Sequence, residues 1–158
     1  MLTCGFCLLK HIGERQMEII RYRTDEYVGL PVETVDDPSM NLASLGMLVS
    51  FLRHHGTDKV TPASLASQHG MGVKTKAKTL GMLLDGGYIA FLRTQSARGP
   101  WGAKMIVSEV PMTPGEIKAH INTLLTRGDV IAVQLMDAYW KTIPGMSFRK
   151  PKSTSANA

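Results

Sequence analysis

The order of helix-start and helix-stop signals in the middle of the chain constrains its fold most. Residues 41–55 carry apolar side chains at three- and four-residue spacing, which predicts an amphipathic helix. Thr61-Pro62 is a helix cap followed by a proline at the first helical position, and it predicts a short helix to about His69. Residues 73–85 predict a third helix. A glycine that stops a helix follows each of the three segments.

Two strands and another helix are expected next. Residues 88–93 and 103–110 have the composition of strands, and the Gly- and Pro-containing segment 94–102 predicts a long tip between them. Together they predict a β-hairpin. Thr113-Pro114 then repeats the cap and proline, so a further helix is expected to run as far as Gly128.

The hydrophobic pattern also predicts which faces are buried. On the first helix the recurring apolar residues are Leu42, Leu45, Val49 and Leu52, with Leu48 and Phe51 beside them. On the third helix they are Val73, Ala77, Leu80 and Leu84. The stretch from Asp129 to Lys141 is compatible with a strand or a helix, and we predict a helix.

Helix, short helix, tight turn, third helix and β-hairpin, in that order, form the layout of a winged helix-turn-helix domain, whose third helix enters the DNA major groove. We therefore expect an α+β fold, mainly α, with an N-terminal extension and a C-terminal helix. The expected segments are a leader at 1–26, the winged domain at 27–112, a helical extension at 113–148 and a disordered basic tail at 149–158.

Residues from about 27 to 113 resemble the winged helix-turn-helix proteins common in actinobacteria and their phages and plasmids, which include transcriptional regulators and replication-associated proteins. The stretches that carry the resemblance are VGLPVETVDD, NLASLGMLV, TPASLA, GMGVKTK, LLDGGYI and GPWGAKMIVSEVPMT. The resemblance implies binding to DNA. One departure is Lys76, because such proteins tend to carry an aliphatic residue in the middle of the third helix. We expect either that its side chain extends from a partly buried flank or that the helix shifts slightly.

The formal net charge of +5 is unevenly distributed along the chain. Residues 1–52 carry −3, residues 53–104 carry +6, residues 105–148 carry −1 and residues 149–158 carry +3. The positive surplus therefore lies in the predicted helix-turn-helix, its wing and the tail. A basic surface of this kind favours a polyanionic partner.

The candidate DNA-binding residues lie on the third helix and on the hairpin. Those on the helix are Lys74, Thr75, Lys76, Lys78 and Thr79. Those on the hairpin are Arg93, Arg98 and Lys104. Ammonium and guanidinium groups bind phosphates or guanine edges, and hydroxyl groups bind either. Trp101 is either a packing residue at the base of the wing or an exposed stacking residue.

The sequence shows no pattern of catalytic residues. It contains no Gly-rich phosphate loop, no Ser-His-Asp arrangement and no nucleophile elbow, so we expect neither enzyme activity nor a cofactor. Cys4 and Cys7 have redox-motif spacing but lack a strand-helix pattern after them. His54, His55 and His69 lie near predicted helix ends, so we expect no metal site.

We therefore predict a cytoplasmic, nucleoid-associated protein that binds double-stranded DNA sequence-specifically, with transcriptional regulation as the first hypothesis. The alternatives are a replication or plasmid- or phage-maintenance protein and a winged-helix adaptor that binds proteins instead. A homodimer through the leader or the helix at 114–127 is expected, although the apolar stripe of that helix can equally cover the core. The sequence identifies no effector pocket.

The chain is expected to be soluble and to have no membrane partner, because charged residues interrupt every apolar run before it reaches about 18 residues. Its first residues do not fit a secretory signal, and two cysteines favour a reducing compartment. Met17 is an alternative start to Met1.

Overall fold

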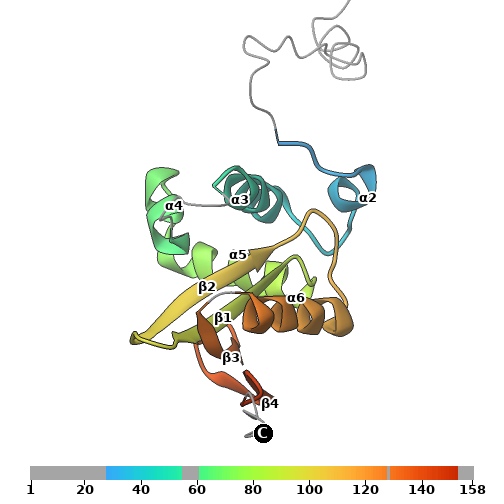
Figure 1. Cartoon of the computed structure of the whole chain (residues 1–158). Helices are drawn as coiled ribbons and strands as arrows, with labels where there is room; N and C mark the ends of the chain where they lie inside the picture. Colours follow the sequence, from blue (N-terminus) through green and yellow to red (C-terminus); the bar gives the residue numbers. More distant parts are fainter. Residues whose placement is uncertain (1–27, 55–60, 128, 153–158) are drawn as a thin grey trace, which may run out of the picture.

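The computed structural model describes residues 28–54, 61–127 and 129–152 (Figure 1). These residues form helices and one antiparallel sheet. The helices are α2 (Val32–Val35), α3 (Leu42–Arg53), α4 (Pro62–Gln68), α5 (Val73–Asp85) and α6 (Pro114–Thr126). The strands are β1 (Ile89–Ser96), β2 (Trp101–Val107), β3 (Val130–Met136) and β4 (Thr142–Arg149). The fold is therefore α+β, as expected from the sequence.

The predicted helices at 41–55, 61–69, 73–85 and 114–127 are confirmed as α3, α4, α5 and α6. Helices α4 and α6 begin with the Thr-Pro pairs, and each threonine takes part in a capping box with the residue three positions later. In α6 the Thr113 N–H donates to Glu116 Oε2 at 2.7 Å. These helix starts could be predicted because the cap involves only neighbouring residues.

The buried face of α3 differs from the predicted one. Leu42 is 87% exposed, whereas Leu48 and Phe51, expected beside the apolar stripe, are buried together with Ser44 and Met47. Ser44 is buried without loss of hydrogen bonding because its hydroxyl donates to the Asn41 carbonyl oxygen at 2.9 Å and accepts from the Asn41 N–H. Because Ser44 can be buried, the helix turns the side that also carries Met47 and Phe51 toward the core, and Leu42 remains exposed.

The hairpin is confirmed, but its long tip is not. Strands β1 and β2 pair antiparallel as far as Gln95 opposite Trp101, so only residues 97–100 form the connection. Most of the segment expected to be a loop, 94–102, therefore belongs to the strands.

The helix predicted from Asp129 to Lys141 is wrong, because Val130–Met136 forms strand β3. This strand pairs with the free edge of β1, and β4 pairs with β3, which gives the strand order β2-β1-β3-β4. The strand conformation of this stretch depends on its pairing with a distant segment, and the local sequence pattern does not reveal that pairing. Arg149, expected at the start of a disordered tail, lies in β4; residues 153–158 lie outside the described part.

Each face of the sheet has its own core. Helices α3, α4 and α5 cover one face, where Ile89 and Phe91 of β1 are buried, and α6 covers the other, where Ala90 and Leu92 are buried (Figure 1). Ile121 and Leu125 of α6 pack into this second core with Val133. The apolar stripe of α6, considered above for dimerisation, therefore contacts the chain's own sheet.

The junction of α5 and β1 requires glycine. Gly87 has φ +80°, and a Cβ atom there would lie 2.8 Å from the Met112 carbonyl oxygen. The Met112 N–H donates to the Gly87 carbonyl oxygen at 2.8 Å, and the Tyr88 N–H donates to the Leu83 carbonyl oxygen at 3.0 Å. These contacts fix the direction in which α5 leaves the sheet.

A hydrogen bond joins this junction to the segment before α3. The Tyr88 hydroxyl donates to Asp37 Oδ2 at 2.7 Å, and the Ser39 hydroxyl and N–H donate to Asp37 Oδ1. The Tyr88 bond, and then the Ser39 bonds, lower the pKa of Asp37 from its ordinary value. Burial, and then the bond to Asp37, raise the pKa of Tyr88.

The observed buried face of α3 leads to a prediction about the free energy of unfolding. Leu48→Ala should lower the free energy of unfolding by about 2–5 kcal/mol, because Leu48 is fully buried in the core. Leu42→Ala should change it by no more than about 0.5 kcal/mol. Urea unfolding of the two variants measures the free energy of unfolding. An equal loss at both positions would contradict the observed buried face of α3.

The Asp37–Tyr88 bond predicts a pH dependence. A carboxyl with a lowered folded-state pKa stabilises the fold above its unfolded pKa, and this contribution is lost as the pH falls through the folded-state value. Tyr88→Phe should therefore be less stable than wild type at neutral pH, and the difference should narrow below pH 3.8, the ordinary value for Asp37. Urea unfolding at several acidic pH values measures this difference in the free energy of unfolding. A difference independent of pH would contradict a stabilising role of the Asp37–Tyr88 bond that depends on the ionised carboxylate.

Candidate nucleic-acid interface

The outward face of α5 carries three of the predicted site residues. Lys74, Thr75 and Lys78 are exposed, and the two lysines are four positions apart, so they are neighbours on the helix surface. Helix α4 precedes α5 through a tight turn at Gly70, whose φ is +68°. The buried residues Thr79 and Leu83 hold the other side of α5 against the core.

Thr79, predicted to face DNA, points into the protein instead. It is 1% exposed, and its hydroxyl donates to the Thr75 carbonyl oxygen at 2.7 Å. This bond within the helix satisfies the hydroxyl, so burying it costs little. The predicted inward face is shifted accordingly, since Val73 is 78% exposed and Ala77 is exposed, while Leu80 and Leu84 are half-buried.

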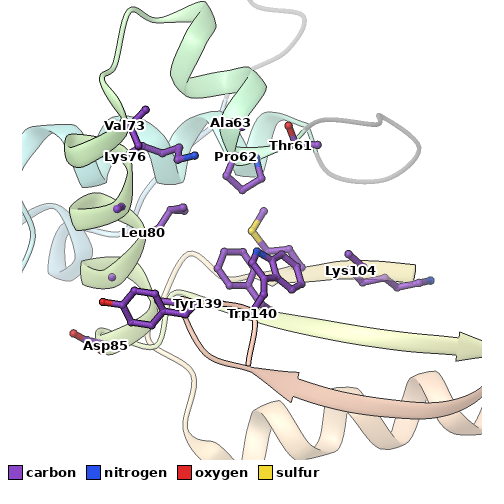
Figure 2. Close-up of a pocket in the computed structure, with 16 residues that line it drawn as sticks. Thr61, Pro62, Ala63, Val73, Lys76, Leu80, Asp85, Lys104, Tyr139 and Trp140 are labelled. Atoms are coloured by element: carbon purple, nitrogen blue, oxygen red, sulfur yellow. The ribbon is translucent and has the colours of Figure 1, made fainter. Parts of the chain in front are cut away.

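Lys76 lies apart from the outward lysines. It is half-buried and borders a cavity between α5 and the sheet (Figure 2). Its ammonium group points toward Pro62 at the start of α4 (Figure 2). The partly buried flank that the sequence predicts for this lysine is therefore present, and the side chain borders an open space.

The three cations of the hairpin lie in different places. The guanidinium of Arg93 lies 4.8 Å from the centre of the Trp101 ring, a cation–π contact that holds it over the sheet. Arg98 is exposed at the tip. Lys104 pairs with Leu92, so its side chain starts from the opposite face to that of Arg93 because successive strand residues alternate. The structure therefore brings Arg93 and Trp101 together, while Lys104 lies at the cavity that Lys76 also borders (Figure 2).

The cavity beside α5 has a volume of about 770 Å³ and walls from four parts of the chain (Figure 2). They are the start of α4, one flank of α5, the middle of β1 and β2, and the turn between β3 and β4. The apolar side chains around it include Pro62, Val73, Leu80, Met105, Tyr139 and Trp140. A second hollow of about 300 Å³ adjoins it, shares Ala103 and Trp140, and is bordered by Arg93 and Trp101.

Tyr139 and Trp140 were missed by the sequence reasoning. The helix predicted over 129–141 placed them inside one element, whereas they lie in the turn that joins two strands. Trp140 stacks on Phe91 with ring centres 5.0 Å apart and an interplanar angle of 24°. The run Asp-Ala-Tyr-Trp-Lys after an apolar stretch was the available signal, since aspartate often begins a turn.

Asp137 builds this turn. Its Oδ1 atom accepts from the N–H groups of Tyr139 and Lys141 at 2.8 and 2.9 Å. Its backbone N–H donates to the Lys141 carbonyl oxygen at 2.8 Å, and its carbonyl oxygen accepts from the Trp140 N–H. Trp140 consequently has φ 57°, a left-handed conformation that costs a residue with a side chain about 1–2 kcal/mol.

Within residues 28–54, 61–127 and 129–152, no group of three or more His, Cys, Asp and Glu side chains could hold a metal ion. The cysteine pair Cys4 and Cys7 and also His55 lie outside the described residues. In the same ranges, no helix has the length and apolar character needed to cross a bilayer.

Comparison of this chain with protein-family models, with curated proteins and with solved structures found no match in any of the three. The function is therefore inferred from the residues of this chain alone. They combine an exposed lysine face on α5 with an aromatic and cationic surface beside that helix.

Proposed function

We propose that this chain binds double-stranded DNA as a winged helix-turn-helix protein, with α4 and α5 as the helix-turn-helix and the β1–β2 hairpin as the wing. The observation that carries the proposal is the exposed face of α5 formed by Lys74, Thr75 and Lys78. An α-helix fits the major groove of B-DNA, where lysines bind phosphates or guanine edges and hydroxyls bind either. Regulation of transcription is the role we propose for this binding.

Charge supports the same partner. Lys74 and Lys78 are like charges four positions apart on one helix, a spacing that costs about 0.2–0.5 kcal/mol in an isolated helix. DNA phosphates would relieve this repulsion. The acidic residue of α5, Asp85, lies at its C-terminal end, away from the two lysines. The N-terminal half of α5 is therefore the end that a phosphate backbone would approach.

The hairpin offers a second point of contact. Arg93 starts from the sheet face that also bears Phe91, on the α5 side, because the two residues are two positions apart on β1. The Trp101 ring holds its guanidinium in place, which reduces the side-chain entropy lost when a phosphate binds. Arg98 at the exposed tip extends the basic surface further.

Replacing both outward lysines tests the proposal. Lys74→Ala with Lys78→Ala should weaken binding to a blunt duplex by roughly tenfold and reduce the slope of log affinity against log salt by about 1.8, or 0.9 for each lost phosphate contact. Both side chains are exposed, so thermal unfolding should stay close to wild type. Fluorescence anisotropy over a salt series measures the affinity and slope.

The matched control is Lys118→Ala, which removes an exposed lysine from α6 on the other side of the sheet. This variant should keep the wild-type slope. Wild-type affinity in the double variant would exclude α5 as the recognition helix. If the wild-type protein itself bound no duplex at low salt, the protein-binding adaptor would replace DNA binding as the proposed function.

A further inference from the structure

We propose that the cavity between α5 and the sheet receives an unpaired base of the nucleic acid held by α5, stacked on the ring of Trp140. This inference rests on the proposed function, because the same nucleic acid must lie on α5. It adds a specific form of DNA to that function, namely a duplex with unpaired nucleotides at an end, gap or bulge.

Trp140 has the geometry of a stacking platform. One face of its ring rests on Phe91, which is buried, while Trp140 itself remains 46% exposed. The ring is therefore supported from behind and borders both the cavity and the adjoining hollow. A base placed against the open face would extend the existing pair of rings to three. Every base has a flat aromatic surface, so such stacking tolerates any sequence.

The turn holds this ring in place at a cost. Trp140 has a left-handed backbone conformation that glycine or asparagine would adopt more easily. Asp137 fixes the turn through the N–H groups of Tyr139 and Lys141, so the two aromatic residues project from a defined backbone. Tyr139 is 84% exposed. Two large exposed aromatic side chains on one built turn indicate a surface that binds a partner.

The size and walls of the cavity fit a base. Its volume of about 770 Å³ lies in the range of sites for small organic ligands. Ala77 and Leu80 of α5 face Met105 of β2 across it, so a flat base would meet apolar groups around its ring. A double helix is too wide for this space, which restricts the occupant to an extruded or unpaired nucleotide.

The charges around the cavity fit the sugar-phosphate backbone at one end. Lys76 points toward Pro62 at the edge of the cavity (Figure 2). Arg93 borders the adjoining hollow. Asp85 lies at the opposite end beside Tyr139 (Figure 2). A carboxylate repels phosphate, so the backbone is expected at the Lys76 end of the cavity, away from Asp85, with the base directed toward Trp140. Helix α5 supplies both this wall and the outward lysines, which places the two sites next to each other.

Fluorescence anisotropy with two labelled probes tests the inference, a short blunt duplex and the same duplex with thymine overhangs. Wild type should bind the overhang probe roughly tenfold more tightly, as expected for one stacked base. Trp140→Leu should lose this advantage and bind both probes with the affinity that wild type shows for the blunt duplex. The Trp101→Phe variant leaves Trp140 as the sole tryptophan, and its fluorescence should be quenched by the overhang probe and not by the blunt one.

The outcomes separate the two proposals. If wild type bound both probes equally, or if Trp140→Leu weakened binding to both by the same factor, the base-stacking proposal would fail and duplex binding would stand. If wild type bound neither probe, both proposals would fail. Thermal unfolding checks that Trp140→Leu is folded. If it is not, the fluorescence of Trp140 in the Trp101→Phe variant decides, because an overhang probe that left this fluorescence unchanged would refute stacking on Trp140.

Discussion

The first half of strand β1 is buried on both faces, and the rest of the structure is arranged around this strand. Ile89 and Phe91 point into the core under α3, α4 and α5, while Ala90 and Leu92 point into the core under α6. All four residues are at most 3% exposed. Burying apolar surface on both faces of one strand stabilises both layers at once. Its two edges pair with β2 and β3, so β1 is also the hydrogen-bonding centre of the sheet.

This arrangement determines how the surface elements lie relative to one another. The Gly87 junction fixes α5 at the start of β1, the antiparallel pair with β2 forms the hairpin, and the pair with β3 brings in the turn that carries Trp140. Phe91 supports the Trp140 ring directly. The lysine face of α5, the Arg93–Trp101 pair and the aromatic turn are thus all positioned by one strand. A rigid scaffold of this kind lowers the entropy cost of binding a partner.

Local signals were enough to predict α3, α4, α5, α6 and the pairing of the hairpin, but not the short helix α2. The Thr61 and Thr113 caps act over three residues, and their positions gave the starts of α4 and α6 correctly. The buried faces were harder, because Ser44 and Thr79 are polar yet form hydrogen bonds within their own helices. The pattern of polar and apolar residues predicts that such side chains are exposed. For this reason Thr79 was wrongly included among the predicted DNA-binding residues.

The C-terminal strands could not be predicted in the same way. Val130–Met136 is held by β1, more than thirty residues earlier in the chain, and no local feature of the segment specifies that pairing. Because the segment was expected to be helical, Tyr139 and Trp140 were not recognised as turn residues. Lys74, Thr75 and Lys78 were predicted correctly as exposed residues of α5, whereas Thr79, placed on the same face by the same helical periodicity, is buried.

We propose that the exposed face of α5 is the surface that contacts nucleic acid. Mapping backbone amide chemical shifts by NMR while a duplex is added tests this claim most directly. We expect the largest changes at Lys74, Thr75 and Lys78, with smaller changes at Arg93 and none at the amides around Lys118 on α6. Changes concentrated on α6, or no changes at all with excess duplex at low salt, would contradict it.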